Sequence, residues 1–238
     1  MKILLTGATG YIGKRLLPIL VSQGHEVVCC VRDKNRFYCP IEFRKNITVI
    51  EVDFLKIETL IAIPTDINAA YYLIHSMSGP DENYDALERI SAENFVHRID
   101  QTTAKQVIYL SGIVNDKSLS KHLSSRKKVE DVLNNGKFAV TTLRAGIIVG
   151  SGSASFEIIR DLVNKLPIMI TPKWLNTKCQ PIAIPVVAAA RPAAGSAPSP
   201  VAARGCSWWF GRAFFGREPY PVARFWVRPR RVRARGPS

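Results

Sequence analysis

Short apolar runs alternate with helical stretches through most of the chain, and this alternation constrains the fold more than any other feature. Six runs are rich in β-branched and aromatic residues, which favour strands: 2–6, 26–32, 47–53, 69–75, 105–112 and 138–146. Helical patterns lie at 11–24, 55–62, 82–103, 118–135 and 153–166. Strands that are apolar on both faces and joined by helices predict a parallel sheet between two helical layers. We therefore expect an α/β, doubly wound fold, which binds ligands beyond the carboxyl ends of its strands.

Three glycines occupy the first junction between strand and helix, in "TGATGYIG" at residues 6–13. Gly7 would allow a tight turn, Gly10 would let a phosphate approach the backbone, and Gly13 would let the helix pack closely on the strand. The helix amino end then offers free N–H groups to a pyrophosphate. The motif predicts a Rossmann-type, NAD(P)-binding turn, although an ordinary glycine-rich turn is the alternative. The other residues expected to bind the cofactor here are Thr6, Thr9, Tyr11 and Ile12.

The end of the second strand indicates which nicotinamide nucleotide is bound. An acidic residue there would bind a ribose 2′-hydroxyl, whereas this chain has Arg32 followed by Asp33, Lys34 and Arg36. The cations suit a 2′-phosphate, so NADP(H) is the preferred cofactor. Asp33 keeps NAD(H) as an alternative, and a solvated loop would explain Lys34 and Arg36 equally well.

Two further strand ends supply candidates for the same site. Asp53 and Phe54 follow the third strand, where an adenine ring would lie, although Asp53 would also serve as a loop cap. His75 and Ser76 follow the fourth strand and would edge a nicotinamide pocket. A single histidine is more often structural, which is the alternative for His75.

The motifs together resemble the short-chain dehydrogenase/reductase superfamily. "TGATGYIG" is similar to the TGxxGxxG turn of its extended and atypical branches, and "VDF" and "VIYLSG" stand where those branches end their third and fifth strands. The segment 143–184 resembles the NmrA-like bacterial NAD(P)-binding proteins, which are nucleoside-diphosphate-sugar epimerase-like. The resemblance covers residues 2–184 and implies an oxidoreductase or epimerase-like enzyme acting on a small substrate. It ends where the family continues with an acidic residue and another helix, because Pro185 and an alanine run follow here.

The resemblance also implies a catalytic Tyr-x-x-x-Lys pair after the fifth strand, and this chain departs from it. His122 and Arg126 stand at the matching positions, and Ser111 matches the usual serine partner. His122 would act as acid or base and Arg126 would hold the cofactor ribose, or both would belong to an exposed helix surface. The missing pair favours a second hypothesis, a non-catalytic NADP(H) redox sensor that acts through a protein partner.

The composition changes near residue 187. Of the formal net charge of +14, residues 188–238 carry +9, with ten arginines, no lysine and one acid. This Ala/Arg/Pro-rich segment lacks a helical or strand period, so we expect an irregular tail after a Rossmann domain at 1–187 that is C-terminally truncated. Its residues are those of GC-rich codons, as an out-of-frame product would have. The alternative, a basic arm for nucleic acid, rests on this tail alone.

The remaining features favour a cytoplasmic protein. No signal peptide or membrane anchor is expected, because Thr6, Gly7 and Gly10 interrupt the first apolar run. The five cysteines form no CxxC pair, which predicts reduced thiols and no metal site.

Overall fold

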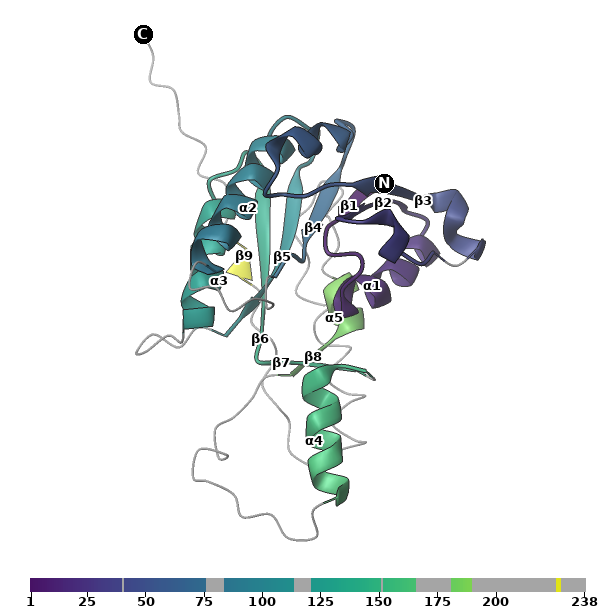
Figure 1. Ribbon diagram of the computed structural model, residues 1–238, viewed down its shortest axis with the longest axis vertical. Coiled ribbons are helices and arrows are strands. Elements are labelled where there is room, and N and C mark those ends of the chain that lie inside the picture. Colours follow the sequence, from purple (N-terminus) through teal and green to yellow (C-terminus); the bar gives the residue numbers. More distant parts are fainter. Residues whose placement is uncertain are drawn as a thin grey trace.

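Six parallel strands form the central sheet of the protein, in the order β3-β2-β1-β4-β5-β6 (Figure 1). The computed structural model describes residues 1–39, 41–75, 84–113, 121–150, 152–165, 181–189 and 226–227. The strands are β1 (Lys2–Leu5), β2 (Glu26–Val31), β3 (Ile47–Glu51), β4 (Ala69–Tyr72), β5 (Gln106–Gly112) and β6 (Ala139–Ala145). All six predicted strands are confirmed, and the order is that of a doubly wound sheet.

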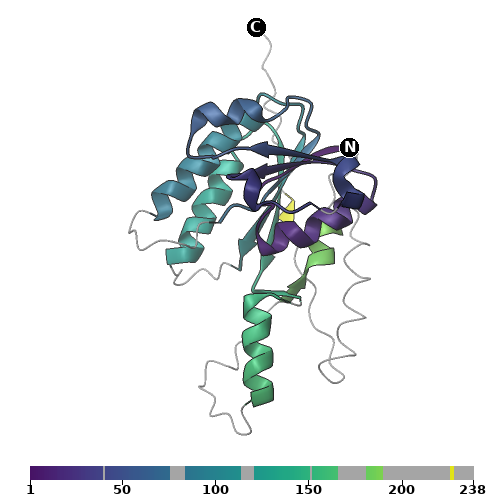
Figure 2. The same ribbon diagram turned by 45° about the vertical axis from the view of Figure 1, so that its right-hand side comes forward.

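Helices cover both faces of the sheet (Figures 1 and 2). The helix α1 (Tyr11–Ser22) packs with α5 (Ile184–Ala189) on one face, while α2 (Tyr84–Ile99) and α3 (Lys121–Leu133) pack together on the other. Alternate strand residues serve the two layers: Ile3 and Leu5 belong to the α1 core, and Leu4 belongs to the α2 core. The predicted α/β fold with a sheet between two helical layers is therefore confirmed.

The apolar stripe predicted within 82–103 explains how α2 is held. Ala92, Phe95 and Ile99 are completely buried, and Val96 packs beside them at the edge of the same core. Phe95 contacts Tyr72 edge to face, with ring centroids 4.7 Å apart, and lies 5.7 Å from the ring of Phe54. This contact joins the carboxyl ends of β3 and β4 to α2.

Three connections on the β2–β3 side of the sheet are short 3₁₀ segments rather than α-helices. They are η1 (Lys34–Arg36), η2 (Ile41–Asn46) and η3 (Ile57–Ala62). The helix predicted at 55–62 is thus wrong in type: after a turn capped by Asp53, the segment forms a six-residue 3₁₀ helix.

A second, smaller unit follows β6. Strands β7 (Ile147–Val149) and β8 (Pro181–Ala183) pair in parallel, and α4 (Ala154–Lys165) extends away from the main sheet (Figure 2). The helix α5 then returns to the main sheet, where Ile184, Val187 and Ala188 are buried. Pro185 is tolerated because it lies in the first turn, where its missing N–H costs no helix hydrogen bond. The helix α5 therefore spans the point at which the composition changes.

Two residues near the end of the chain extend the sheet. Strand β9 (Trp226–Val227) pairs antiparallel with β6, opposite Thr142 and Thr141. Among the helices that the structure describes, none has the length and apolar character that a membrane crossing needs.

Candidate functional site

The glycine turn between β1 and α1 has the conformation that the sequence predicts. Gly7 has a φ of +64°, which disfavours any other residue, and a Cβ there would lie 2.8 Å from the carbonyl oxygen of Leu73. A Cβ on Gly13 would collide with the carbonyl oxygen of Gly7 and the backbone of Ala8. Both glycines are therefore required for the chain to leave β1 and pack α1 directly against the turn.

Gly10 is less crowded than Gly7 and Gly13. It occupies the position that caps α1, no side chain caps the helix there, and its nearest neighbour for an added Cβ is the Gly7 carbonyl oxygen at 3.2 Å. The first N–H groups of a helix have no partner within the helix, and they point along its axis toward the turn. The turn thus leaves an open approach to the amino end of α1, as an anionic phosphate requires.

Thr6 lies behind this turn rather than on its surface. Its buried hydroxyl donates to the Tyr71 carbonyl at 3.0 Å and accepts the N–H of Leu73 at 2.9 Å. These bonds join the ends of β1 and β4. The side chain of Thr6 therefore positions the turn, whereas Thr9 is exposed at the tip and Ile12 is half-buried in the first turn of α1.

Tyr11 connects the turn to the segment before α4. Its hydroxyl lies 2.6 Å from where a Cβ on Gly150 would be, and the guanidinium of Arg15 lies 5.3 Å from the centre of its ring. Tyr11 therefore packs between the amino end of α1 and the backbone that follows β7.

The cations predicted to recognise a 2′-phosphate are exposed at the end of β2. Arg32, Lys34 and Arg36 have no carboxylate partner among the residues that the structure describes. The carboxylate of Asp33 accepts the N–H of Asn35 at 2.9 Å and caps η1. Three positive charges around one capped turn form an unpaired basic rim beside the glycine turn.

Asp53 and Phe54, which lie just past the end of β3, both make contacts within the protein that stabilise the fold. The carboxylate of Asp53 accepts the N–H of Leu55 at 3.0 Å, which is the loop-cap alternative weighed for it. Phe54 is buried against Phe95, and its carbonyl accepts the side-chain amide of Asn94 at 2.7 Å. The packing of Phe54 turns this residue into the core, so only Asp53 is partly exposed at the strand end.

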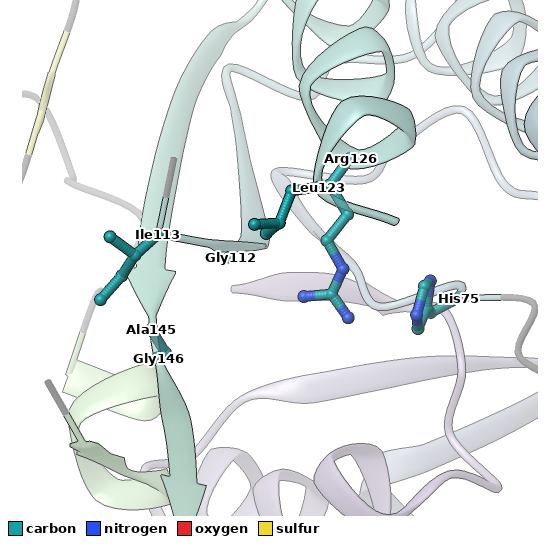
Figure 3. A pocket seen from close by; sticks show the side chains of 7 residues that line it. All are labelled: His75, Gly112, Ile113, Leu123, Arg126, Ala145 and Gly146. Atoms are coloured by element: carbon teal, nitrogen blue, oxygen red, sulfur yellow. The ribbon is translucent and has the colours of Figure 1, made fainter. Parts of the chain in front are cut away.

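A cavity of about 330 Å³ opens at the carboxyl ends of β4, β5 and β6 (Figure 3). Seven residues line it: His75, Gly112, Ile113, Leu123, Arg126, Ala145 and Gly146. A Cβ at Gly112 would meet the end of the Leu123 side chain, so this glycine leaves room for Leu123 in the lining. The lining is apolar or backbone apart from one imidazole and one guanidinium, and such a composition is typical of small-molecule sites.

The imidazole of His75 is held by a buried carboxylate that the sequence analysis did not identify. His75 Nδ1 lies 2.7 Å from Glu88 Oε1 on α2, and the hydroxyl of Ser125 on α3 donates to Glu88 Oε2. The side chain of Glu88 is 6% exposed, against 22% for His75. The sequence shows a glutamate on the predicted helix 82–103. It does not show that this glutamate faces β4, because the rotation of the helix depends on tertiary packing.

Arg126 and Ser111 occupy different environments. The guanidinium of Arg126 projects into the cavity (Figure 3) and has no ion-pair partner among the described residues. The side chain of Ser111 is buried at 1% exposure and is not part of the cavity lining. His122 lies in the first turn of α3, with its side chain outside the described structure, and Ser76 also lies outside the described residues.

Two tyrosines near the cavity do not replace the expected catalytic tyrosine. Burial raises the pKa of Tyr72 and the pKa of Tyr109 far above the usual range for a phenol. The Tyr109 hydroxyl donates to the backbone carbonyl of Arg126 at 3.3 Å. Both phenols therefore remain protonated and belong to the core under α2 and α3.

A glycine turn at the first crossover of a doubly wound sheet, with a cavity at the same edge, defines a dinucleotide-binding protein. The family model described as NAD(P)H-binding matches residues 7–161, and the chain belongs to this family. The resemblance seen in the sequence, to NAD(P)-binding proteins of the atypical short-chain dehydrogenase/reductase type, agrees with this family. No curated protein matches the chain in sequence.

Several solved structures share the fold at low sequence identity. The Bordetella bronchiseptica enzyme WbmG, in complex with NAD, has a TM-score of 0.64 and 16% identity over 84% of this chain and 71% of its own. A nucleoside-diphosphate-sugar epimerase from Staphylococcus aureus has a TM-score of 0.51 and 18% identity over 60% of this chain, which spans 50% of that protein. The NADPH-dependent quinone oxidoreductase QOR2 from Escherichia coli, complexed with NADPH, has a TM-score of 0.50 and 20% identity over 60% of this chain and 48% of its own.

Proposed function

We propose that the protein is an NADP(H)-dependent oxidoreductase or epimerase-like enzyme that acts on a small carbonyl or hydroxyl compound. The observation that supports this proposal is the position of the cavity, which opens at the same carboxyl edge of the sheet as the glycine turn. A dinucleotide whose phosphates contact Gly10 would place its nicotinamide among the residues after β4 and β5. The nicotinamide would exchange a hydride with the substrate there.

The residues present fit such a cofactor at three points. Gly10 leaves an open approach to the amino end of α1, and the unpaired rim of Arg32, Lys34 and Arg36 suits a 2′-phosphate. In the cavity, Arg126 would hold the nicotinamide ribose from α3, the position that a lysine has in the related enzymes. Two of the solved structures with this fold are an epimerase and a quinone oxidoreductase, and both agree with this class of chemistry.

The cofactor preference is tested by calorimetric titration of the full chain with NADPH, NADP⁺, NADH and NAD⁺. We expect NADPH to bind more tightly than NADH, and Arg32→Ala to weaken NADPH binding by roughly 10- to 100-fold, the value of one charge-assisted contact. NADH binding should change little, because NADH has no 2′-phosphate. Lys105→Ala is the matched control, since Lys105 is an exposed cation immediately before β5, at the opposite edge of the sheet.

Equal weakening of NADPH and NADH by Arg32→Ala would contradict the 2′-phosphate assignment. Absence of heat with all four nucleotides, in protein that unfolds cooperatively, would contradict the proposed function itself.

One observation favours a second function, a redox sensor that binds NADP(H) and acts through a protein partner. His122 and Arg126 replace the Tyr-x-x-x-Lys pair, so the usual proton-transfer residues are missing. A sensor would bind NADPH and NADP⁺ with different consequences for a partner and would show no turnover. Steady oxidation of NADPH with a defined carbonyl compound would exclude it.

We further propose that the protein is cytoplasmic and that its thiols stay reduced. Cys29 and Cys30 are buried in β2 as free thiols, and burial raises the pKa of Cys29 to about 12. Such thiols are packing groups rather than nucleophiles.

A further inference from the structure

We infer that His75 is the proton donor and acceptor of the cavity, and that Glu88 and Ser125 are the residues that position it. This inference rests on the proposed function, because it assigns a chemical step within the same site. It moves the proton chemistry from α3, where the related enzymes have it, to the carboxyl end of β4.

The contact with Glu88 fixes the tautomer of the His75 imidazole. A carboxylate only accepts hydrogen bonds, so Nδ1 of His75 must carry a proton to pair with Glu88 at 2.7 Å. Nε2 is then the nitrogen that remains for a ligand, and His75 lines the cavity (Figure 3). A histidine oriented in this way presents a lone pair when neutral and an N–H when charged.

Both oxygens of the Glu88 carboxylate have hydrogen-bond partners. Glu88 is buried, and its second oxygen accepts the hydroxyl of Ser125. A buried carboxylate with both oxygens paired costs less than an isolated one and has little freedom to turn away. Three elements therefore converge on one ring, with His75 after β4, Glu88 on α2 and Ser125 on α3.

Among the residues that the structure describes, no other side chain of the cavity lining competes with His75 for proton transfer. Apart from His75 the cavity lining is glycine, aliphatic side chains and Arg126, whose guanidinium stays protonated. The side chain of Ser111 is buried outside the lining, and Tyr72 and Tyr109 are core phenols. Within the described lining, His75 is the side chain that can both donate and accept a proton.

In the reduction of a carbonyl compound, a bound reduced nicotinamide would supply the hydride that forms a C–H bond at the carbonyl carbon, and the C=O π pair would move onto the oxygen. The oxygen takes the proton from Nε2–H of the charged His75, which becomes neutral and keeps Nδ1–H on Glu88. Solvent reprotonates Nε2 through the open cavity, and oxidation of an alcohol uses the same groups in reverse.

The first test needs no substrate. Long-range ¹H–¹⁵N spectra of the full chain, with His75 assigned by comparison with His75→Gln, should show the neutral ring as the Nδ1–H tautomer. Glu88→Gln should lose this preference, whereas His97→Gln, which changes an exposed histidine on α2, should not affect the His75 signals. An Nε2–H tautomer in the unmodified protein would overturn the inference.

The second test uses NADPH-dependent reduction of 4-nitrobenzaldehyde. His75→Ala should lower kcat by roughly 100-fold or more with KM changed by less than about threefold, the range for removal of a general acid. Added imidazole should restore part of the rate in His75→Ala alone.

Glu88→Gln keeps the shape of the carboxyl group, so it separates positioning from folding. We expect a lower kcat with unchanged NADPH affinity and unchanged cooperative unfolding. NADPH binding without reduction of the aldehyde, a His75→Ala variant as fast as the unmodified protein, or no rescue by imidazole would overturn the inference and leave cofactor binding intact. Failure to bind NADPH at all would instead overturn the proposed function.

Discussion

Gly10 and Gly13 have different roles in the glycine turn, as the surroundings of an added Cβ atom show. At Gly13 a Cβ would meet the backbone of Gly7 and Ala8, whereas at Gly10 it would meet only the Gly7 carbonyl oxygen at 3.2 Å. The spacing of the glycines predicted the roles of Gly10 and Gly13, because a turn from a strand to a helix needs a glycine at each of these positions in the motif. Thr6 was predicted in the same motif, but its hydrogen bonds to β4 depend on which strand lies beside β1.

Gly10→Ala and Gly13→Ala should therefore differ in kind. We expect Gly13→Ala to destabilise the protein by about 1–3 kcal/mol, because backbone atoms must move. Gly10→Ala should unfold nearly as the unmodified protein does but bind NADPH roughly tenfold or more weakly, because its methyl group fills the approach to the phosphates. Thermal unfolding and calorimetry on both variants check this. Unchanged NADPH affinity in Gly10→Ala would place the pyrophosphate elsewhere.

At the scale of elements, local sequence predicted the strands well because each is a short apolar run that ends at a polar residue or glycine. The stripe on α2 predicted its buried face, and Ala92, Phe95 and Ile99 are fully buried. The contact between Glu88 and His75 was not predictable, because it depends on how α2 is rotated against β4. Strands β7 and β8 have three residues each and are too short for a periodic signal, and Pro185 hid the start of α5.

Because α5 docks through few side chains, its packing is open to a direct test. Val187 is completely buried against the α1 core, whereas Val186 is only partly buried at its edge. Val187→Ala should lower the free energy of unfolding by roughly 2 kcal/mol through the cavity that it leaves, and Val186→Ala by clearly less. Denaturant unfolding of the two variants measures the difference, and equal losses would mean that α5 is not docked as described.

On the scale of the whole molecule, charge and structure divide the chain differently. Most of the net charge belongs to residues 188–238, yet Ala188 is buried in α5, and β9 pairs with β6. We propose that residues 1–187 form a cofactor-binding domain whose last helix extends to Ala189, and that the basic segment beyond it takes no part in NADPH binding. The composition showed where the sequence changes in character. It could not show that a helix spans this point, because alanine and valine occur both in the Rossmann domain and in the segment after it.

A chain that ends after Ala189 should bind NADPH with the affinity of the full chain, within about twofold, since all proposed contacts lie before it. A chain that ends after Ala183 should lose roughly 3 kcal/mol or more of stability with the buried Ile184 and Val187. Calorimetry and thermal unfolding of the three chains compare them. Loss of NADPH binding in the chain ending at Ala189 would show that the basic segment contributes to the site.

The contact between Tyr11 and Gly150 has a consequence for how this protein can change. Tyr11 is the first residue of α1, and its hydroxyl lies 2.6 Å from where a Cβ at position 150 would be. A larger residue at position 150 would therefore displace the Tyr11 side chain. Residue 150 and the first turn of α1 are thus coupled through one tyrosine, although they lie far apart in the sequence.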